Sequence, residues 1–439
     1  MNSSSDAAVG IAAGESAAAP GAPSSAPADS SSSGDAPRRA RVGLLPRILV
    51  AIVLGILLGL VMPEAIARIF TTFNGLFSGF LGFLIPLIIV GLVTPAIAEL
   101  GRGAGKMLAA TTGIAYLSTI LCGLFALGLS LLLLPRMLGD ASIGTLENPE
   151  DSAIAPYFAI EIPPVFDVMT ALVLSFCLGI GLTLVKKGAL QESFEQLRTI
   201  IVRIIEAIII PLLPIYIFGM FLGLTMNGQI WTVIGTFLAV IVLVFGMTVV
   251  VLLAQYGIAG LAIGRNPLKM LGNMMPAYMT ALGTSSSAAT IPVTVECTKR
   301  NGIPDAIADF VIPLCATIHL AGSTLKITTF AVAIMIVTGM DLNVPALLAV
   351  VFMLGVVMIA APGVPGGAIM AAAGVLSSML GFGEAAVGLM IAAYIAIDSF
   401  GTATNVTGDG AIAAVMTRLS KGRVSGDLTV SQHEHVHGV

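Results

Sequence analysis

Polar side chains recur at helical spacing in an otherwise apolar segment near the C-terminal end of the chain. In IAAYIAIDSFGTATNVTGDG, residues 391–410, the residues Asp398, Thr402, Asn405 and Asp409 are spaced 4, 3 and 4 apart. At about 100° per residue, these four side chains fall on one stripe of a helix. Two carboxylates on one buried face are costly unless a cation meets them. We therefore expect the stripe to bind a cation or an ammonium group; the alternative is an aspartate paired within the helix bundle.

A second apolar segment, ATIHLAGSTLK at 316–326, carries two unusual side chains. His319 is the only histidine outside the C-terminal tail, and Lys326 is the only basic residue between Arg300 and Arg418. Gly322 between them predicts a locally loosened helix, and opened backbone would offer carbonyls to an alkali cation. Lys326 is either an internal partner of an aspartate or a fixed charge that replaces a coupling cation, and His319 is either a coupling group or a hydrogen-bonded core residue.

Composition places these segments in a membrane. The 439 residues are 57% hydrophobic and 10% charged, which is typical of a polytopic membrane protein, and the net charge of -4 indicates no nucleic-acid partner. The core has no Ser/His/Asp set, histidine-carboxylate metal cluster or phosphate loop, so we expect no enzyme and no cofactor. The polar ends, 1–40 and 421–439, are predicted to be disordered or solvated tails, and HEHVH in the second lacks the stable helix that a zinc site needs.

Eight apolar runs are long enough to span the bilayer. We place them near residues 46–62, 75–98, 108–134, 165–185, 198–226, 230–263, 305–338 and 385–417. If the spans alternate, nearly all basic residues fall on one side, so both termini are predicted to be cytoplasmic and the acidic loop 136–164 extracellular. A cell-membrane location follows.

Two further apolar segments do not fit as spans. Residues 266–298 have basic residues at both ends and are interrupted by GTSSSAATIP, whereas 343–382 have none and are interrupted by APGVPGG. Such backbone at membrane depth must line a cavity. We therefore predict an all-α fold of eight transmembrane helices plus two re-entrant hairpins of opposite entry, related as inverted repeats, with the substrate site where their tips meet.

Four motifs carry a family resemblance. TSSSAATIPVT (284–294), PLCATIHLAGST (313–324), GVPGG (363–367) and NVTGD (405–409) together resemble the dicarboxylate/amino acid:cation symporter family, which includes the glutamate transporters, over roughly residues 44–420. The resemblance implies a homotrimer with an elevator mechanism, in which a transport domain moves against a scaffold. The scaffold would comprise 44–107 and 165–229. The transport domain would comprise helix 3 at 108–135 and residues 230–420, with helix 7 at 305–340, unwound at IHLAG, and helix 8 at 385–418.

The same resemblance assigns roles to residues of this chain. Asp398 would accept the substrate's α-ammonium, and Asn405 with Ser286 and Ser287 would bind its α-carboxylate. The remaining pocket residues would be Ser323, Gly401 and Thr402, with Gly363, Val364 and Pro365 in the second hairpin as a lid. One sodium site would use the carbonyls of Cys315, His319 and Asn405 with the carboxylate of Asp409. A second would use carbonyls of Thr317, Met358, Ile359 and Ala361.

Two departures from the family pattern bear on the substrate and the ions. Acidic-substrate members carry an arginine where this chain has Gly401, and many carry another where it has Ser285. We therefore expect a neutral substrate. We also expect space beside Gly401 for a bulkier substrate side chain. A dicarboxylate or acidic amino acid, with Lys326 as surrogate counter-ion, is the alternative.

The second departure is HLAGS where the family usually reads NMDGT. Ala321 replaces the carboxylate of a third sodium site, to which Tyr116 and Thr119 would contribute, so that sodium is expected to be lost. The hypothesis is a symporter that imports a small neutral amino acid with a sodium gradient, or a proton gradient, and with fewer coupling ions. The alternative of another class is a passive facilitator or anion-conducting channel.

Overall fold

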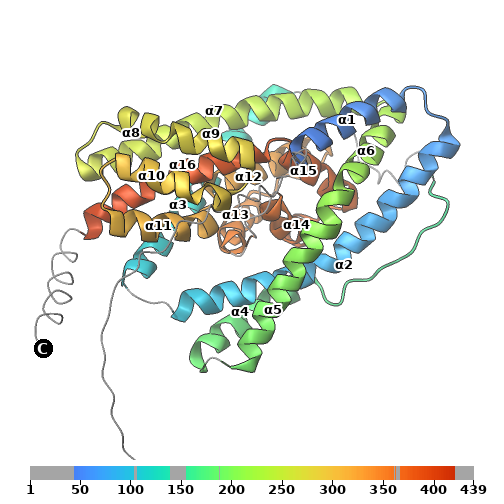
Figure 1. Ribbon diagram of the computed structural model, residues 1–439. Helices are drawn as coiled ribbons and strands as arrows, with labels where there is room; N and C mark the ends of the chain where they lie inside the picture. Colours follow the sequence, from blue (N-terminus) through green and yellow to red (C-terminus); the bar gives the residue numbers. More distant parts are fainter. Residues whose placement is uncertain are drawn as a thin grey trace, which may run out of the picture. The chain divides into compact units, whose positions relative to one another are not determined.

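Backbone within a bilayer must satisfy its hydrogen bonds internally, and helices do so within one segment. The computed structural model describes residues 44–102, 106–138, 155–186, 188–359, 361 and 366–420, and this part of the chain contains helices and no strand (Figure 1). The predicted tails and most of the predicted extracellular loop lie outside the described residues. The helices, in chain order, are α1 (Leu44–Gly59), α2 (Glu64–Arg102), α3 (Lys106–Leu138), α4 (Val168–Leu184), α5 (Ala189–Ile204), the π-helix η1 (Ile205–Ile209), α6 (Ile210–Met226), α7 (Ile230–Ile263), α8 (Pro267–Asn273), α9 (Met275–Thr284), α10 (Ser287–Arg300), α11 (Asp305–Ile318), α12 (Ala321–Val337), α13 (Val344–Met358), α14 (Gly367–Leu380), α15 (Glu384–Ala396) and α16 (Asp398–Ser420).

Each of the eight predicted spans overlaps a helix or a consecutive set of helices. Within the described residues, five helical segments are long and apolar enough to cross a membrane, and a sixth is the pair α15 and α16, bent by 63° at their junction. The helices at the first and fourth predicted spans, α1 and α4, are apolar but shorter. The chain is therefore a polytopic, all-helical membrane protein, and the full count of eight spans stays a prediction.

The helices pack in two sets. Helices α1, α2, α4, α5 and α6 contact one another, whereas α3 contacts α11, α12, α13 and α16. Contacts between the sets involve α14 with α2 and α4, α15 with α1 and α6, and α7 with α6. The division into a static scaffold and a moving transport domain stays a prediction.

Both predicted hairpins contain two packed helices with a break between them. In the first, α9 ends at Thr284, Ser285 adopts a left-handed backbone with φ of 50°, and Ser286 caps α10 by accepting from the Ala289 N–H. In the second, α13 packs against α14, and Gly366, with φ of 75°, precedes α14. The tip residues Gly363, Val364 and Pro365 lie outside the described residues.

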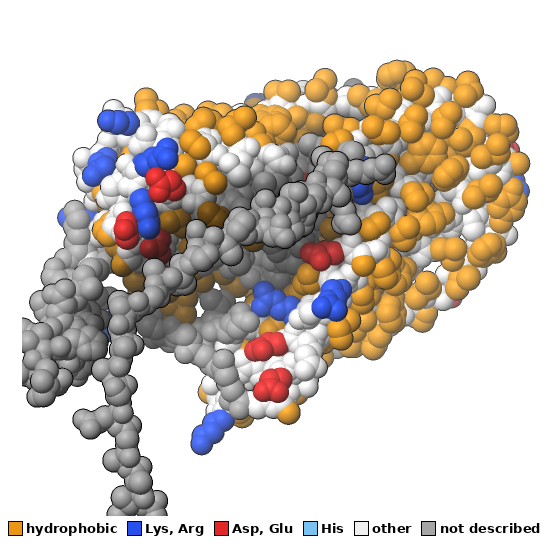
Figure 2. Space-filling view, viewed as in Figure 1, with side chains coloured by type: hydrophobic (Ala, Val, Ile, Leu, Met, Phe, Trp, Pro, Cys, Tyr) orange, Lys and Arg blue, Asp and Glu red, His pale blue; other side chains and the backbone are white. Residues whose placement is uncertain are grey.

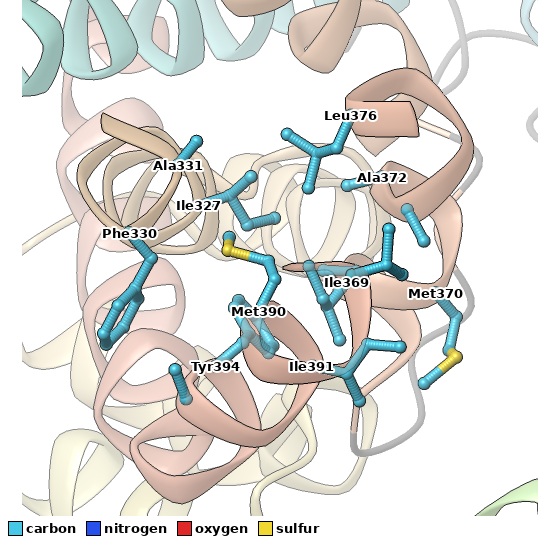
Figure 3. Close-up of a cluster of buried hydrophobic side chains, with 14 of the residues drawn as sticks. Ile327, Phe330, Ala331, Ile369, Met370, Ala372, Leu376, Met390, Ile391 and Tyr394 are labelled. Carbon is cyan, nitrogen blue, oxygen red and sulfur yellow. The ribbon is translucent and has the colours of Figure 1, made fainter. Parts of the chain in front are cut away.

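Apolar packing fixes the elements that meet at the centre. Figure 3 shows Ile327, Phe330 and Ala331 of α12 facing side chains of α14 and α15, all of them buried. The α14 and α15 side chains in this cluster are Ile369, Met370, Ala372, Leu376, Met390, Ile391 and Tyr394. Because such cores are close-packed, the middle of α12 and the last turn of α15 are held in fixed positions.

The surface is apolar over three helices of the first set, α1, α2 and α6. Figure 2 shows hydrophobic side chains over α1, α2 and α6, and charged side chains gathered over α8–α10 and over α5. Large side chains are exposed on several spans, including Leu57, Trp231 and Leu261. An exposed apolar surface of this extent is expected for a protein in contact with lipid.

Candidate functional site

The polar stripe predicted at residues 398–409 lies on a single helix. The chain breaks at Ile397, and α16 then begins at Asp398. Asp398, Thr402, Asn405 and Asp409 are all buried. The break itself was not predicted, because the sequence IAIDS carries neither proline nor glycine.

The unwinding of the seventh span predicted at IHLAG, residues 318–322, is found within that motif. Helix α11 ends at Ile318, His319 and Leu320 have non-helical backbone, and α12 begins at Ala321. Asn405 closes the new helix end: its Oδ1 accepts from the N–H of Gly322 at 2.8 Å and of Ser323 at 3.4 Å.

Gly322 serves close packing instead of loosening the helix. A Cβ at this position would lie 2.7 Å from the Cβ of Thr404 and 2.8 Å from the carbonyl oxygen of Gly401. The expectation that glycine loosens the helix here is therefore wrong. Glycine lets α12 approach α16 closely enough for Asn405 to reach the backbone of α12.

Lys326 fills the space beside Gly401. Its Nζ lies 3.3 Å from the carbonyl oxygen of Ile397, 3.4 Å from both the carbonyl oxygen and Oδ1 of Asp398, and 3.9 Å above the ring centre of Tyr394. A Cβ at Gly401 would lie only 2.3 Å from this ammonium. The expectation that this volume is open to a bulkier substrate is therefore wrong, because the lysine side chain occupies it.

Asp398 is bonded on both oxygens. Oδ1 faces Lys326, and Oδ2 accepts from the N–H of Gly366 at 2.8 Å. The carboxylate thus joins α12, α16 and the start of α14. A carboxylate has about four acceptor positions, so these two contacts leave capacity for a further donor.

A small cavity lies in front of Asp398. Its volume is about 30 Å³, room for about one or two water molecules and too little for an amino acid. Its walls come from α9–α10, the break in the seventh span, α14, α15 and α16, and consist of Ser285, Ser287, Ala316, Thr317, Leu320, Ser323, Ala361, Gly367, Ala368, Tyr394, Asp398, Thr402 and Asn405. The first turns of four helices, α10, α12, α14 and α16, border this cavity.

Most predicted pocket residues with described positions meet at this cavity. Ser287, Ser323, Asp398, Thr402 and Asn405 line it. Ser286 does not: its hydroxyl caps α10, and Ser285 lines the cavity instead. Gly401 faces Lys326 rather than the cavity.

Tyr394 is a site residue that the sequence analysis missed. Its hydroxyl donates to Ser323 Oγ at 2.9 Å, and the same oxygen accepts from Asn405 Nδ2 at 3.1 Å. Tyr394 precedes Asp398 by four residues and so continues the stripe by one turn, a spacing that was available in the sequence.

The residues of the predicted first sodium site are engaged with one another. His319 Nδ1 lies 2.8 Å from Asp409 Oδ1, the Cys315 carbonyl accepts from the His319 backbone N–H, and the Asn405 amide caps α12. The imidazole thus contacts one oxygen of the Asp409 carboxylate, whereas the other oxygen, Oδ2, is buried with no hydrogen-bond partner among the described atoms. The first sodium site stays a prediction.

A hydrogen-bonded chain extends from His319 to two further polar residues. Nε2 lies 3.1 Å from Ser118 Oγ, which accepts from Gln255 Nε2 at 3.1 Å. With its proton on Nδ1, the imidazole donates to Asp409 and accepts from Ser118. Neither Ser118 nor Gln255 was predicted, although Gln255 is the only amide side chain between residues 230 and 263.

Residues of the predicted second sodium site lie at or beside the cavity. Thr317 and Ala361 line the cavity, and the Met358 carbonyl accepts from the Ala361 N–H at 3.2 Å.

Of the residues expected at the third site, Thr119 is buried with no hydrogen-bond partner for its hydroxyl among the described atoms, and Tyr116 is half-buried against Gly355. Carbonyl and hydroxyl oxygens are the ligand types that hard cations prefer.

Apolar helices around a polar cavity with a buried lysine–aspartate pair are the features of a polytopic membrane protein with an internal polar site. The family model of the sodium:dicarboxylate symporters matches residues 44–419. The chain therefore belongs to the sodium:dicarboxylate symporter family, as its four motifs predicted. The family description names sodium as the transported ion, so sodium enters as a coupling ion and not as a cofactor.

Curated relatives agree with this assignment. Excitatory amino acid transporter 1 of Rattus norvegicus is 31% identical over 254 residues, which cover 57% of this chain and 46% of the relative. Excitatory amino acid transporter 3 of Mus musculus is 30% identical over 254 residues, with 56% and 48% covered. Excitatory amino acid transporter 4 of Mus musculus is 31% identical over 254 residues, with 56% and 44% covered. The chain spans about half the length of these relatives.

Proposed function

We propose that this protein is a cation-coupled symporter that imports a small neutral amino acid. The observation that carries the proposal is the cavity before Asp398, where helix starts from both predicted hairpins and both broken spans meet around one carboxylate. Its described lining contains no basic side chain, and Asp398 is already compensated by Lys326. A zwitterion of zero net charge fits this electrostatic balance better than a substrate with an extra carboxylate.

The proposal extends to the architecture. Eight spans with two re-entrant hairpins would form a homotrimer in the plasma membrane, with both termini cytoplasmic and with an elevator motion of the transport domain. Family membership and the basic residues that the alternating spans place on one side support this arrangement.

Sodium is the proposed coupling ion, bound mainly at the second site. Thr317 and Ala361 at the cavity support this, whereas the His319 side chain on Asp409 favours fewer sodium ions than three. Because a histidine hydrogen-bonded to a carboxylate is also a proton carrier, a proton gradient is the second candidate.

Uptake into proteoliposomes tests the function. With an inward sodium gradient, labelled serine or alanine should accumulate above its external concentration, and aspartate and succinate should not compete. Preference for aspartate or succinate would show an acidic substrate with Lys326 as counter-ion. Equilibration that ignores both sodium and proton gradients would show a passive facilitator.

Asp398→Asn tests the ammonium role. Loss of a charge-assisted hydrogen bond of about 1.5–3 kcal/mol predicts an apparent affinity that is lower by roughly ten- to hundredfold. Ser399→Ala, at the next buried position and outside the cavity lining, is the matched control. Unchanged transport by the Asp398 variant would refute this role.

A further inference from the structure

Within the described part of the chain, protein groups surround the ammonium of Lys326. The side chain is about 2% exposed, and its contacts are two backbone carbonyls, the Asp398 carboxylate and the face of Tyr394. It does not line the cavity. Lys326 therefore stands behind Asp398 and acts on a substrate only through that carboxylate.

Lys326 and Gly401 form a matched pair. The Nζ and Cε atoms of Lys326 lie 2.3 Å from the position of a Cβ on residue 401. Even a methyl group there would exclude the ammonium from its present place. The absence of a side chain at 401 is thus what lets a cation from α12 reach Asp398.

The lysine neutralises a carboxylate that also holds α14. While Oδ1 faces Lys326, Oδ2 accepts from the Gly366 N–H at the start of α14. All three groups belong to the protein, so this closed contact needs no substrate. Without the lysine, the buried aspartate would be an uncompensated charge whenever no substrate ammonium is bound, which is strongly unfavourable.

We propose that Lys326 is a permanent counter-ion of Asp398 that lets α14 close onto Asp398 within the transport domain, so that the domain can return across the membrane without substrate. The protein would then be a net importer and not an obligate exchanger. The inference rests on the proposed function and deepens it. Lys326 is a positioning residue in this cycle, because it acts through Asp398.

The two halves of the transport cycle can be measured separately in proteoliposomes. Net uptake is measured into vesicles without internal amino acid and requires the substrate-free return. Exchange is measured into vesicles loaded with unlabelled amino acid and uses substrate in both directions. In exchange, the substrate's own ammonium can compensate Asp398, so this activity does not need the lysine.

Lys326→Met removes the charge and keeps most of the volume. We expect net uptake to fall at least about tenfold, equivalent to about 1.4 kcal/mol on the barrier, while exchange remains measurable at near the wild-type rate. Leu325→Met places the same side chain at the neighbouring buried position and should leave both rates unchanged. Lys326→Gln, a polar neutral replacement, should give the same split and serves if the methionine variant fails to fold.

Several outcomes would overturn the proposal. One is an equal change of net uptake and exchange in folded Lys326 variants, including the loss of both, which would assign the lysine to folding or to substrate binding. Another is a wild-type protein that exchanges without net uptake, a result that needs no variant. If the wild type moves no amino acid in either assay, the proposed function fails instead.

Discussion

Gly322→Ala is predicted to separate α12 from α16 and to disturb the substrate cavity. The new methyl group would lie 2.7 Å from Thr404 Cβ and 2.8 Å from the Gly401 carbonyl oxygen. Carbon atoms pack favourably at about 3.5–4.0 Å, so the two helices must move apart by roughly 1 Å. The carbonyl belongs to the backbone and cannot rotate away as a side chain can.

The cost has two parts. Overpacking of this kind costs about 1–3 kcal/mol. The Gly322 N–H would also lose its 2.8 Å contact with Asn405 Oδ1, and a buried N–H without a partner costs about 1–3 kcal/mol. We expect a loss of about 2–6 kcal/mol in the free energy of unfolding. The apparent affinity for substrate should fall as well, because Asn405 lines the cavity.

Thermal unfolding of purified protein measures this loss through a thiol-reactive dye, since Cys122, Cys297 and Cys315 are buried and become reactive on unfolding. Gly246→Ala in α7 is the matched control, because a Cβ there meets nothing within 4 Å and Ala is favoured over Gly in a helix by about 0.5–1 kcal/mol. If both variants melted together and kept wild-type substrate affinity, the close approach of α12 to α16 would be refuted.

Two further predictions concern single hydrogen bonds. His319→Asn removes the imidazole from Asp409 and opens that carboxylate to a cation. Sodium chloride, compared with choline chloride, should therefore raise the melting temperature of the variant more than that of the wild type. Equal shifts in melting temperature would contradict the replacement of sodium by His319. Tyr394→Phe removes one of two donors to Ser323 Oγ. A net loss of about 0.5–1.5 kcal/mol predicts an apparent substrate affinity, measured by initial uptake rates, that is lower by roughly two- to tenfold. Wild-type affinity in this variant would show that the phenol only fills space.

The positions of spans and breaks were largely predictable from the sequence. Long apolar runs require helices in lipid, so the predicted spans overlap the observed helices. Serine- and glycine-rich runs inside such segments marked the breaks at Ser285 and before Gly366, because polar backbone at that depth must be enclosed.

The partners of the buried polar groups were less predictable. Helical spacing put Asp398 and Asn405 on one face, but the position of Lys326 depends on how α12 and α16 are rotated about their axes and on the space at Gly401. The start of α12 directly after His319 and Leu320 likewise depends on Asn405, which lies far along the chain and caps α12. Contacts of this kind are set by tertiary packing, which a local pattern does not encode.

The meeting of four helix starts at one cavity gives it an electrostatic character that no side chain supplies. Helices α10, α12, α14 and α16 each turn their first residues towards it, so four macrodipoles present their positive ends to the same small volume. An incoming carboxylate would therefore meet a positive potential even though the described lining holds no arginine or lysine. A transporter built in this way attracts the anionic end of its substrate with backbone alone, and its side chains are left to select the rest of the molecule.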